Sequence, residues 1–538
     1  MDHVLAFHVE NFGCRATQAD GAALERQFEE RGLARVSATD ADVVILNTCT
    51  VTAAADQDAR AAIRRLQRQN PNAKIVVTGC YAQRAPEEIA ALPGVTCVVG
   101  NSHKHQLAEI VLPSVRTRWD RNKHSQPGHE AKEHQWQEHE RRGHDREGHD
   151  FSCAATAEHS LALAAEVSQP GDRAFVPLAS LASRSGEPES ESRIFVSDIF
   201  AHTELLAAPV FDLLGDAHDS QRTRPNLKVQ DGCDNRCSFC VIPYVRGQSR
   251  SLPLPQILRE VDALVEAGYR ELVVSGINLG RWGRDLADGG FEDLLRAILA
   301  ETSLEKLRIS SVEPMDWSDE LISLVARSPR IAKHAHVPLQ SGSDSVLRRM
   351  HRKYRPWHYR EKIEKIRAAM PVAAIGADVM VGFPGESDAE FEATRRLIED
   401  LPFTYLHVFT YSARPGTPAA NMQNQVPIHV ARERSRSLRD LADEKKRAFM
   451  RSFVGKALEV ITLRSCGAGT PARKDSATND CEREFCVPAE VGAFTEALTD
   501  NYQKLHLKGH HEPNRWLRCR VERVEDGALV ASQQSAEN

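Results

Sequence analysis

Three closely spaced cysteines in the middle of the chain have the spacing of a metal-binding loop. They follow the predicted strand 227–230 in the pattern C-x3-C-x2-C and are called the central triad here: Cys233, Cys237 and Cys240. Thiolates are soft ligands that suit iron–sulfur clusters. Three thiolates ligate three irons of a four-iron cubane and leave the fourth iron open to a small molecule. The odd number disfavours disulfides, and zinc, the alternative, has no obvious fourth ligand nearby.

Three further cysteines each follow a predicted strand within residues 1–113. The predicted strands 4–10, 42–47 and 73–78 alternate with helices, which indicates a parallel α/β sheet. The carboxyl ends of parallel strands share one edge of the sheet, where ligands bind. We therefore expect a second metal site from the amino-terminal triad, defined as Cys14, Cys49 and Cys80. The alternative is that these are buried apolar thiols, which is the expectation for Cys97 in the predicted strand 95–99.

The elements that position these cysteines belong to a chain long enough for about three domains. Its 538 residues carry 69 basic and 75 acidic side chains, a formal charge of −6, so the whole chain is not a basic nucleic-acid binder. Twelve cysteines, with no apparent signal peptide or membrane-spanning run, predict a cytoplasmic protein that uses cysteine for metal chemistry, with no membrane partner.

Residues 225–426 are predicted to form a catalytic domain in which polar and glycine motifs collect at strand ends. Six strands alternate with helices such as 251–267 and 291–300, which predicts a partial (β/α)6 barrel with its chemistry at the carboxyl ends of the strands. The predicted strands are 227–230, 271–275, 307–311, 335–339, 374–381 and 406–411.

Residues 114–224 are predicted to be a low-complexity insertion without a stable fold. Histidines recur every five residues, a period that gives neither a helical nor a strand face: His124, His129, His134, His139, His144 and His149. A solvated loop is favoured over a metal site because the tract lacks apolar residues to hold ligands in place. A second loop insertion, 466–486, contains Cys466, Cys481 and Cys486, and a zinc site there lacks a fourth ligand.

The last part of the chain is predicted to contain a basic connector helix at 427–452 and a small β-barrel at 453–538. The connector binds phosphate or is a solvated helix face with internal ion pairs. The barrel is predicted from strands 457–463, 494–498, 504–507, 517–522 and 528–531. Its basic side chains, with Tyr502 and Trp516 nearby, suit structured RNA. The candidate RNA-binding residues are Lys504, Lys508, Arg515, Arg518, Arg520 and Arg523.

Several motifs resemble the radical-SAM methylthiotransferase family. They are NFGCR at 11–15, NTCTVT at 47–52, TGCYAQ at 78–83, the central cysteine loop with Phe239 before its last cysteine, and GFPGE at 382–386. Residues 497–507 resemble the TRAM domain, which ends this family and binds tRNA. The resemblance implies two 4Fe-4S clusters, one on the central triad and an auxiliary cluster on the amino-terminal triad. It also implies S-adenosylmethionine as a cofactor, bound at the open iron of the central cluster and cleaved to a 5′-deoxyadenosyl radical.

Radical-SAM barrels further imply which residues lie near S-adenosylmethionine. By this analogy Gly276 and Asn278 lie near the methionine amino group, and Phe239 lies near adenine. Glu313, Gln340 and Ser341 lie near ribose and methionine. Gly276 as a simple turn residue and Glu313 as a surface carboxylate are the alternatives. The implied partners are tRNA, S-adenosylmethionine and an electron donor such as flavodoxin or ferredoxin.

The branch of the family that best matches the motifs adds a methylthio group to C2 of N6-threonylcarbamoyladenosine at tRNA position 37. The alternatives are, in order, the isopentenyladenosine branch, a ribosomal-protein aspartate methylthiotransferase, and a non-catalytic iron–sulfur RNA-binding or redox-sensing protein. The threonylcarbamoyl group carries a carboxylate, whose burial requires a cationic or hydrogen-bonding partner. Arg246, Arg250 and Arg414 are the predicted partners, with phosphate or S-adenosylmethionine as their alternative ligands.

Overall fold

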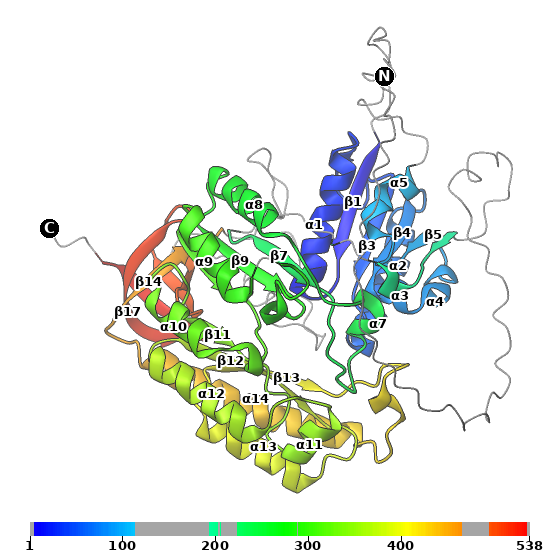
Figure 1. The fold of residues 1–538 in the computed structure, drawn as a ribbon. Coiled ribbons are helices and arrows are strands. Elements are labelled where there is room, and N and C mark those ends of the chain that lie inside the picture. Colours follow the sequence, from blue (N-terminus) through cyan, green and yellow to red (C-terminus); the bar gives the residue numbers. More distant parts are fainter. Residues whose placement is uncertain are drawn as a thin grey trace, which may run out of the picture. The chain divides into compact units, whose positions relative to one another are not determined.

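The amino-terminal residues form a parallel sheet with strand order β2-β1-β3-β4-β5-β6 in the computed structural model (Figure 1). The model describes residues 5–112, 193–202, 205, 223–287, 289–464 and 494–534. The strands are β1 (Ala6–Asn11), β2 (Ala34–Arg35), β3 (Val43–Thr48), β4 (Lys74–Gly79), β5 (Val95–Val99) and β6 (Arg193–Phe195). The helices are α1 (Arg15–Glu29), α2 (Ala53–Gln69), α3 (Cys80–Arg84), α4 (Pro86–Ala90) and α5 (Leu107–Val111), with the short 3-10 helix η1 (Lys104–Gln106).

The sixth strand corrects one prediction from the sequence. Residues 193–195 pair in parallel with β5, and the 3-10 helix η3 (Ile199–Ala201) follows them. The prediction that residues 114–224 lack a stable fold is therefore wrong for residues 193–195, which form an edge strand of the sheet. The His-rich tract and the loop with Cys466, Cys481 and Cys486 lie outside the described residues.

Six parallel strands form the catalytic barrel in the order β7-β9-β10-β11-β12-β13. Single parallel bridges, such as Ser311 with His336, join its two sheets between β10 and β11. The strands are β7 (Asn226–Asp231), β9 (Glu271–Gly276), β10 (Lys306–Ile309), β11 (His334–His336), β12 (Ala374–Val381) and β13 (Tyr405–Thr410). A two-residue strand, β8 (Arg250–Ser251), pairs antiparallel with β7.

Helices on the outside of this barrel bury one continuous apolar core against the strands (Figure 1). Leucine, isoleucine and valine recur along them at helical spacing, and serine hydroxyls cap α10 and α13. The helices are α8 (Leu254–Glu266), α9 (Phe291–Glu301), α10 (Asp319–Arg327), α11 (Asp344–Arg349), α12 (Pro356–Ala369) and α13 (Asp388–Asp400). A further helix, α7 (Ile242–Arg246), packs its apolar side chains with Cys80 of the amino-terminal domain instead. Short 3-10 helices occur at η4 (Leu279–Arg281), η5 (Pro314–Asp316) and η6 (Pro418–Asn421).

A long helix, α14 (Ile428–Arg451), leads to a closed β-barrel of five strands. The strands are β14 (Ala457–Thr462), β15 (Phe494–Thr499), β16 (Lys504–Lys508), β17 (Trp516–Glu525) and β18 (Ala528–Gln533). The predicted fold class, a parallel α/β domain, a partial barrel and a small β-barrel, is thus confirmed. The described residues belong to one compact unit. Within the described residues, no helix has the length and apolar character needed to span a membrane.

Candidate active site

The central triad lies on the loop that leaves the carboxyl end of β7. Gly232 makes the turn into the loop at φ +73°, and a Cβ there would lie 1.9 Å from the carbonyl oxygen of Gln248. Hydrogen-bond donors surround the sulfurs. Asn278 Nδ2 lies 3.6 Å from Cys233 Sγ, and Arg352 Nη1 lies 3.2 Å from Cys237 Sγ. Donors aimed at sulfur stabilise thiolates and tune the cluster that they bind.

Most residues predicted to lie near S-adenosylmethionine surround this loop. Gly276 packs against Gln230, whose side chain would lie 2.9 Å from an added Cβ, and Gln230 Oε1 accepts the backbone N–H of Asn278 at 2.7 Å. Phe239 packs edge-on against Phe383, with ring centroids 6.5 Å apart.

Glu313 is an ion-pair residue rather than a surface carboxylate. Its side chain pairs with Arg352, which also contacts the central triad. Burial raises the pKa of Glu313, and Arg352 opposes that rise. The pair therefore holds a carboxylate beside the triad, where a ligand amine or hydroxyl can reach it.

Gln340 and Ser341 differ from each other in what they offer a ligand. Gln340 has a left-handed backbone, φ +63°, held by hydrogen bonds in both directions with β12: its N–H donates to Asp378 and its carbonyl accepts from Met380. Ser341 is fully buried, and its hydroxyl contacts Thr394 and accepts the N–H of Ser343. The side chain of Ser341 is thus enclosed by protein, and the predicted place of Gln340 and Ser341 near ribose and methionine stays a prediction.

The amino-terminal triad converges at the strand ends of the first sheet. Gly13 has φ +113°, and a Cβ on it would lie 2.4 Å from Cys49 Cβ, so only glycine lets β1 end this close to Cys49. Burial, followed by the neighbouring Cys14 and Cys80, raises the pKa of the Cys49 thiol. Asn101 Nδ2 donates toward Cys80 Sγ at 3.6 Å. Cys97 is buried within β5, in accordance with its prediction as a core residue.

The donor sets of both triads fit clusters better than disulfides or a single ion. All eight cysteines in the described part of the chain are free thiols. In that same part, the one group of potential ligands whose atoms all lie within 4.8 Å of one another is His336, Asp378 and His407. The sulfurs of each triad therefore lie farther apart than those of a zinc site, which surround one ion at about 2.3 Å. Because neighbouring thiols oppose one another's ionisation, a bound metal is needed to compensate three thiolates.

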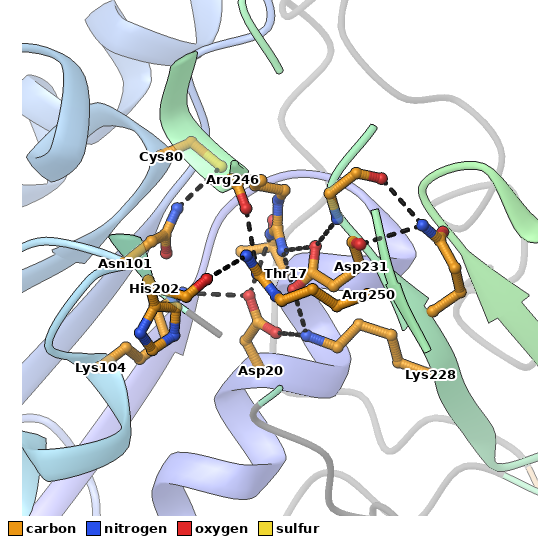
Figure 2. A network of polar contacts seen from close by, with 12 residues as sticks. Thr17, Asp20, Cys80, Asn101, Lys104, His202, Lys228, Asp231, Arg246 and Arg250 are labelled. Atoms are coloured by element: carbon orange, nitrogen blue, oxygen red, sulfur yellow. Dashed lines mark hydrogen bonds and ion pairs between the residues drawn. The ribbon is translucent and has the colours of Figure 1, made fainter. Parts of the chain in front are cut away.

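A buried network of charges joins the amino-terminal domain to the catalytic barrel beside the first triad (Figure 2). Asp20 on α1 accepts from Lys104 Nζ at 3.0 Å and from Arg246 Nη2 at 3.0 Å, and it also pairs with Lys228. Arg246 further pairs with Asp231 at 2.9 Å. The electrostatic influence of Arg246 reaches Cys49, where it lowers the thiol pKa against the effect of burial. The network thus places fixed positive charge next to three potential thiolates.

The network corrects the prediction that arginines near the cavity mouth bind the substrate carboxylate. Arg246 is 2% exposed and is held by two aspartates. Arg250 donates to the carbonyls of His202 and Arg246. Arg414 is 3% exposed, pairs with Asp56 and donates to Thr50 Oγ1 at 2.7 Å. All three therefore tie parts of the protein together.

The candidate RNA-binding residues in the last domain are more neutralised than the sequence indicates. Four of them make ion pairs within the barrel: Lys504 with Glu496, Lys508 with Glu522, Arg515 with Glu512 and Arg523 with Glu525. Arg518 and Arg520 are exposed and alternate with buried Cys519 along β17. Within the described residues no ion pair neutralises these two, so they are the members of the predicted set whose charge is left for phosphate.

The aromatic residues predicted to suit RNA face the catalytic barrel instead. Tyr502 packs against His334 and Tyr405, with centroids 4.7 Å and 5.8 Å apart, and Arg308 lies over its ring. Lys306 lies over the ring of Trp516 at 5.1 Å. Both rings are therefore engaged with the catalytic barrel, and the suitability of the basic barrel for RNA stays a prediction.

Two sets of functional residues were missed from the sequence. Arg352 contacts the central triad from the loop between α11 and α12, far along the chain, and no local spacing indicates it. Lys228 and Asp231 lie fully inside the molecule on β7. Their charges in an otherwise buried strand were a usable signal, because buried charges in native proteins are paired.

Two family models match the chain. The radical SAM superfamily covers residues 227–398, and the uncharacterized protein family UPF0004 covers residues 6–100. Each therefore includes one cysteine triad.

Curated relatives match most of the chain. Threonylcarbamoyladenosine tRNA methylthiotransferase MtaB of Bacillus subtilis is 32% identical over 94% of this chain and 90% of its own length. The protein of the same name from Aquifex aeolicus is 33% identical over 84% of this chain and 92% of its own. A tRNA-2-methylthio-N(6)-dimethylallyladenosine synthase of Novosphingobium aromaticivorans is 32% identical over 85% and 86%.

Among solved structures, the radical S-adenosylmethionine methyltransferase TsrM of Kitasatospora setae aligns with a TM-score of 0.47 at 15% identity. That alignment covers 78% of this chain and 74% of the other.

Proposed function

The chain belongs to the radical-SAM methylthiotransferase family, and from this premise we propose that it adds a methylthio group to C2 of N6-threonylcarbamoyladenosine at position 37 of tRNA. The observation that carries the proposal is the match along most of the chain to relatives named for this reaction. Two cysteine triads, each just past the end of a strand in one of two joined domains, support it.

The central triad is proposed to hold the catalytic cluster, with Asn278 and Arg352 as donors to its sulfurs. Glu313 and the backbone around Gln340 and Gly276 are proposed to orient S-adenosylmethionine at the open iron. The amino-terminal triad is proposed to hold the auxiliary cluster. When bound, the clusters and S-adenosylmethionine supply the 5′-deoxyadenosyl radical that abstracts hydrogen from adenine C2 and the methylated sulfur that replaces it.

Other residues of the chain are proposed to hold the two triads and the tRNA in place for the reaction. The Asp20 network and the Arg414–Asp56 pair hold the two domains together, and both triads are proposed to face a common space. Arg518 and Arg520 are proposed as phosphate contacts for tRNA, with binding that weakens as salt rises. A small electron-transfer protein such as flavodoxin or ferredoxin is the proposed reductant, and the cytoplasm, where tRNA is modified, is the proposed compartment.

The test gives reconstituted enzyme two tRNAs that differ only in the N6 substituent of adenosine 37. Mass spectrometry of nucleosides is expected to find the methylthio product from the threonylcarbamoyl form. Relatives named for either substrate match this chain to a similar degree. Conversion of the isopentenyl form alone would therefore refute the proposed substrate but leave the proposed reaction class standing. Absence of product from both, with 5′-deoxyadenosine still formed, would refute the reaction.

A further inference from the structure

Polar side chains line the inner face of the catalytic barrel below the central triad. Along β12, Ile375, Ala377 and Val379 belong to the apolar core between strands and helices. The alternate residues of the same strand, including Asp378, therefore point to the opposite face, which is the inside of the barrel. Asp378 retains 27% exposure of its side chain, so this interior is reachable.

Two histidines from the neighbouring strands join Asp378 at this level. His407 on β13 is the direct cross-strand partner of Asp378. His336 on β11 places Nε2 at 3.3 Å from Asp378 Oδ1, yet this buried nitrogen makes no well-directed hydrogen bond. The ligand atoms of the three side chains all lie within 4.8 Å of one another. They are called the lumen cluster below: His336, Asp378 and His407.

The lumen cluster lies next to the residues proposed to hold S-adenosylmethionine. The carbonyl of Asp378 accepts the N–H of Gln340 at 2.8 Å. Asp378 lies close enough to Arg352 and Glu313 for its charge to interact with theirs. Arg352 in turn contacts Cys237 of the central triad. A substrate atom attacked by a radical formed at the central triad must enter this same interior.

The side of the lumen cluster away from the central triad is filled by aromatic rings. Tyr405 bonds His334 Nε2 at 2.7 Å and packs against Tyr502. Its ring occupies the space over Gly376, where a Cβ would lie 1.9 Å from Tyr405 Cζ. These rings form a floor, so a substrate group that reaches the lumen cluster comes from the side of the central triad.

We propose that the lumen cluster is the subsite for the polar substituent on N6 of the target adenine, an inference that rests on the proposed function. Of the arginines predicted to bind the substituent's carboxylate, Arg246 and Arg414 are held in internal ion pairs and Arg250 donates to backbone carbonyls. The imidazole of His407 is half-buried and can donate an N–H group to that carboxylate, while the more enclosed His336 lies against Asp378. Asp378 can accept from the hydroxyl or the carbamoyl N–H groups while it orients the imidazoles.

The same arrangement disfavours an isopentenyl substituent. An apolar chain in this position would displace water from these polar groups without replacing its hydrogen bonds, which is unfavourable. A site built to bond polar atoms rejects an apolar analogue much more strongly than an apolar pocket rejects a polar one. The lumen cluster therefore acts as a specificity determinant.

The experiment compares kcat/KM of reconstituted variants on the two matched tRNAs described above. His407→Leu and Asp378→Asn are expected to lower kcat/KM on the threonylcarbamoyl tRNA about 10- to 100-fold, with iron content unchanged. On the isopentenyl tRNA, kcat/KM stays the same or rises. His407→Gln, which keeps a side-chain donor, is expected to recover part of the loss. His358→Leu, an exposed histidine on α12, serves as the matched control.

Each contrary result has a separate meaning. If the wild type converts the threonylcarbamoyl tRNA and the variants do so equally well, the subsite is wrong and the function stands. An equal loss on both tRNAs, or loss of a metal ion beyond the cluster iron, assigns the lumen cluster a general or metal-binding role and overturns the proposal. If wild type prefers the isopentenyl tRNA, the proposed function and the subsite both fail.

Discussion

Replacing Asp20 with Asn tests whether the buried charge network holds the two domains together. Asn keeps the size of the side chain and removes its charge. Lys104, Lys228 and Arg246 then face one fewer anion, and Asp231 alone remains to balance them. Because the cations are at most 4% exposed, water cannot replace the lost carboxylate.

The expected loss in the free energy of unfolding can be estimated in two ways. Burial alone would raise the pKa of Asp20, but Lys104, Lys228 and Arg246 lower it from 3.8 to about 2. A folded-state pKa below the unfolded one stabilises the protein above pH 4, and the contribution is lost as pH falls toward 2. The shift corresponds to about 2.5 kcal/mol at pH 7. Removing one partner of a buried pair costs about 3–5 kcal/mol, so about 3 kcal/mol is expected.

The assay is urea unfolding of the holoenzyme at pH 7, followed by circular dichroism under anaerobic conditions. With a dependence of about 1–3 kcal/mol per molar urea, the first transition of Asp20→Asn should shift down by about 1–3 M. Glu30→Gln is the matched control. It removes a carboxylate paired with Arg26 at the exposed end of the same helix, and surface pairs contribute about 0–1 kcal/mol. Equal midpoints for the two variants would refute the role of the network.

Three further predictions concern the triads and the barrel interior. Changing the central triad to alanine should halve the iron content, from about eight to about four per chain, and abolish 5′-deoxyadenosine formation; full iron retention would contradict the assignment. Changing the amino-terminal triad should leave 5′-deoxyadenosine formation intact but remove the methylthiolated nucleoside, and normal product would make those cysteines core residues. Gly376→Ala should lower thermal stability by about 1–3 kcal/mol through overpacking against Tyr405, whereas an unchanged melting temperature would place that ring elsewhere.

The fold and the two triads could be predicted because their signals are local. The strand predicted at 374–381 is β12 with the same bounds, since a run of apolar and small residues ends at a glycine and proline motif. Both triads stand directly after strands, and parallel strands bring their ends to one edge whatever their distance in sequence. Cys14, Cys49 and Cys80 could thus be grouped without any knowledge of side-chain positions.

The roles of the charged residues could not be predicted because they depend on partners far along the chain. Arg246 follows the central triad closely and was expected at the substrate, yet its partners include Asp20 in another domain. Arg414 is similarly bound to Asp56. Tyr502 lies in a turn that resembles an RNA-binding module, but its ring packs on the catalytic barrel. Composition gives the number of charges in a segment, while pairing decides which of them remain for a ligand.

The domain-linking charges stand on the helices that directly follow the cysteines. Asp20 lies on α1, whose N-cap is Cys14, and Arg246 ends α7, which begins two residues after Cys240. Asp56, the partner of Arg414, follows Cys49 at the start of α2. A movement of either domain would therefore shift the cysteines together with the charges that join the domains. In the proposed reaction a sulfur held by the amino-terminal triad must reach a carbon activated at the central triad, so the geometry of that reaction would depend directly on the buried ion pairs.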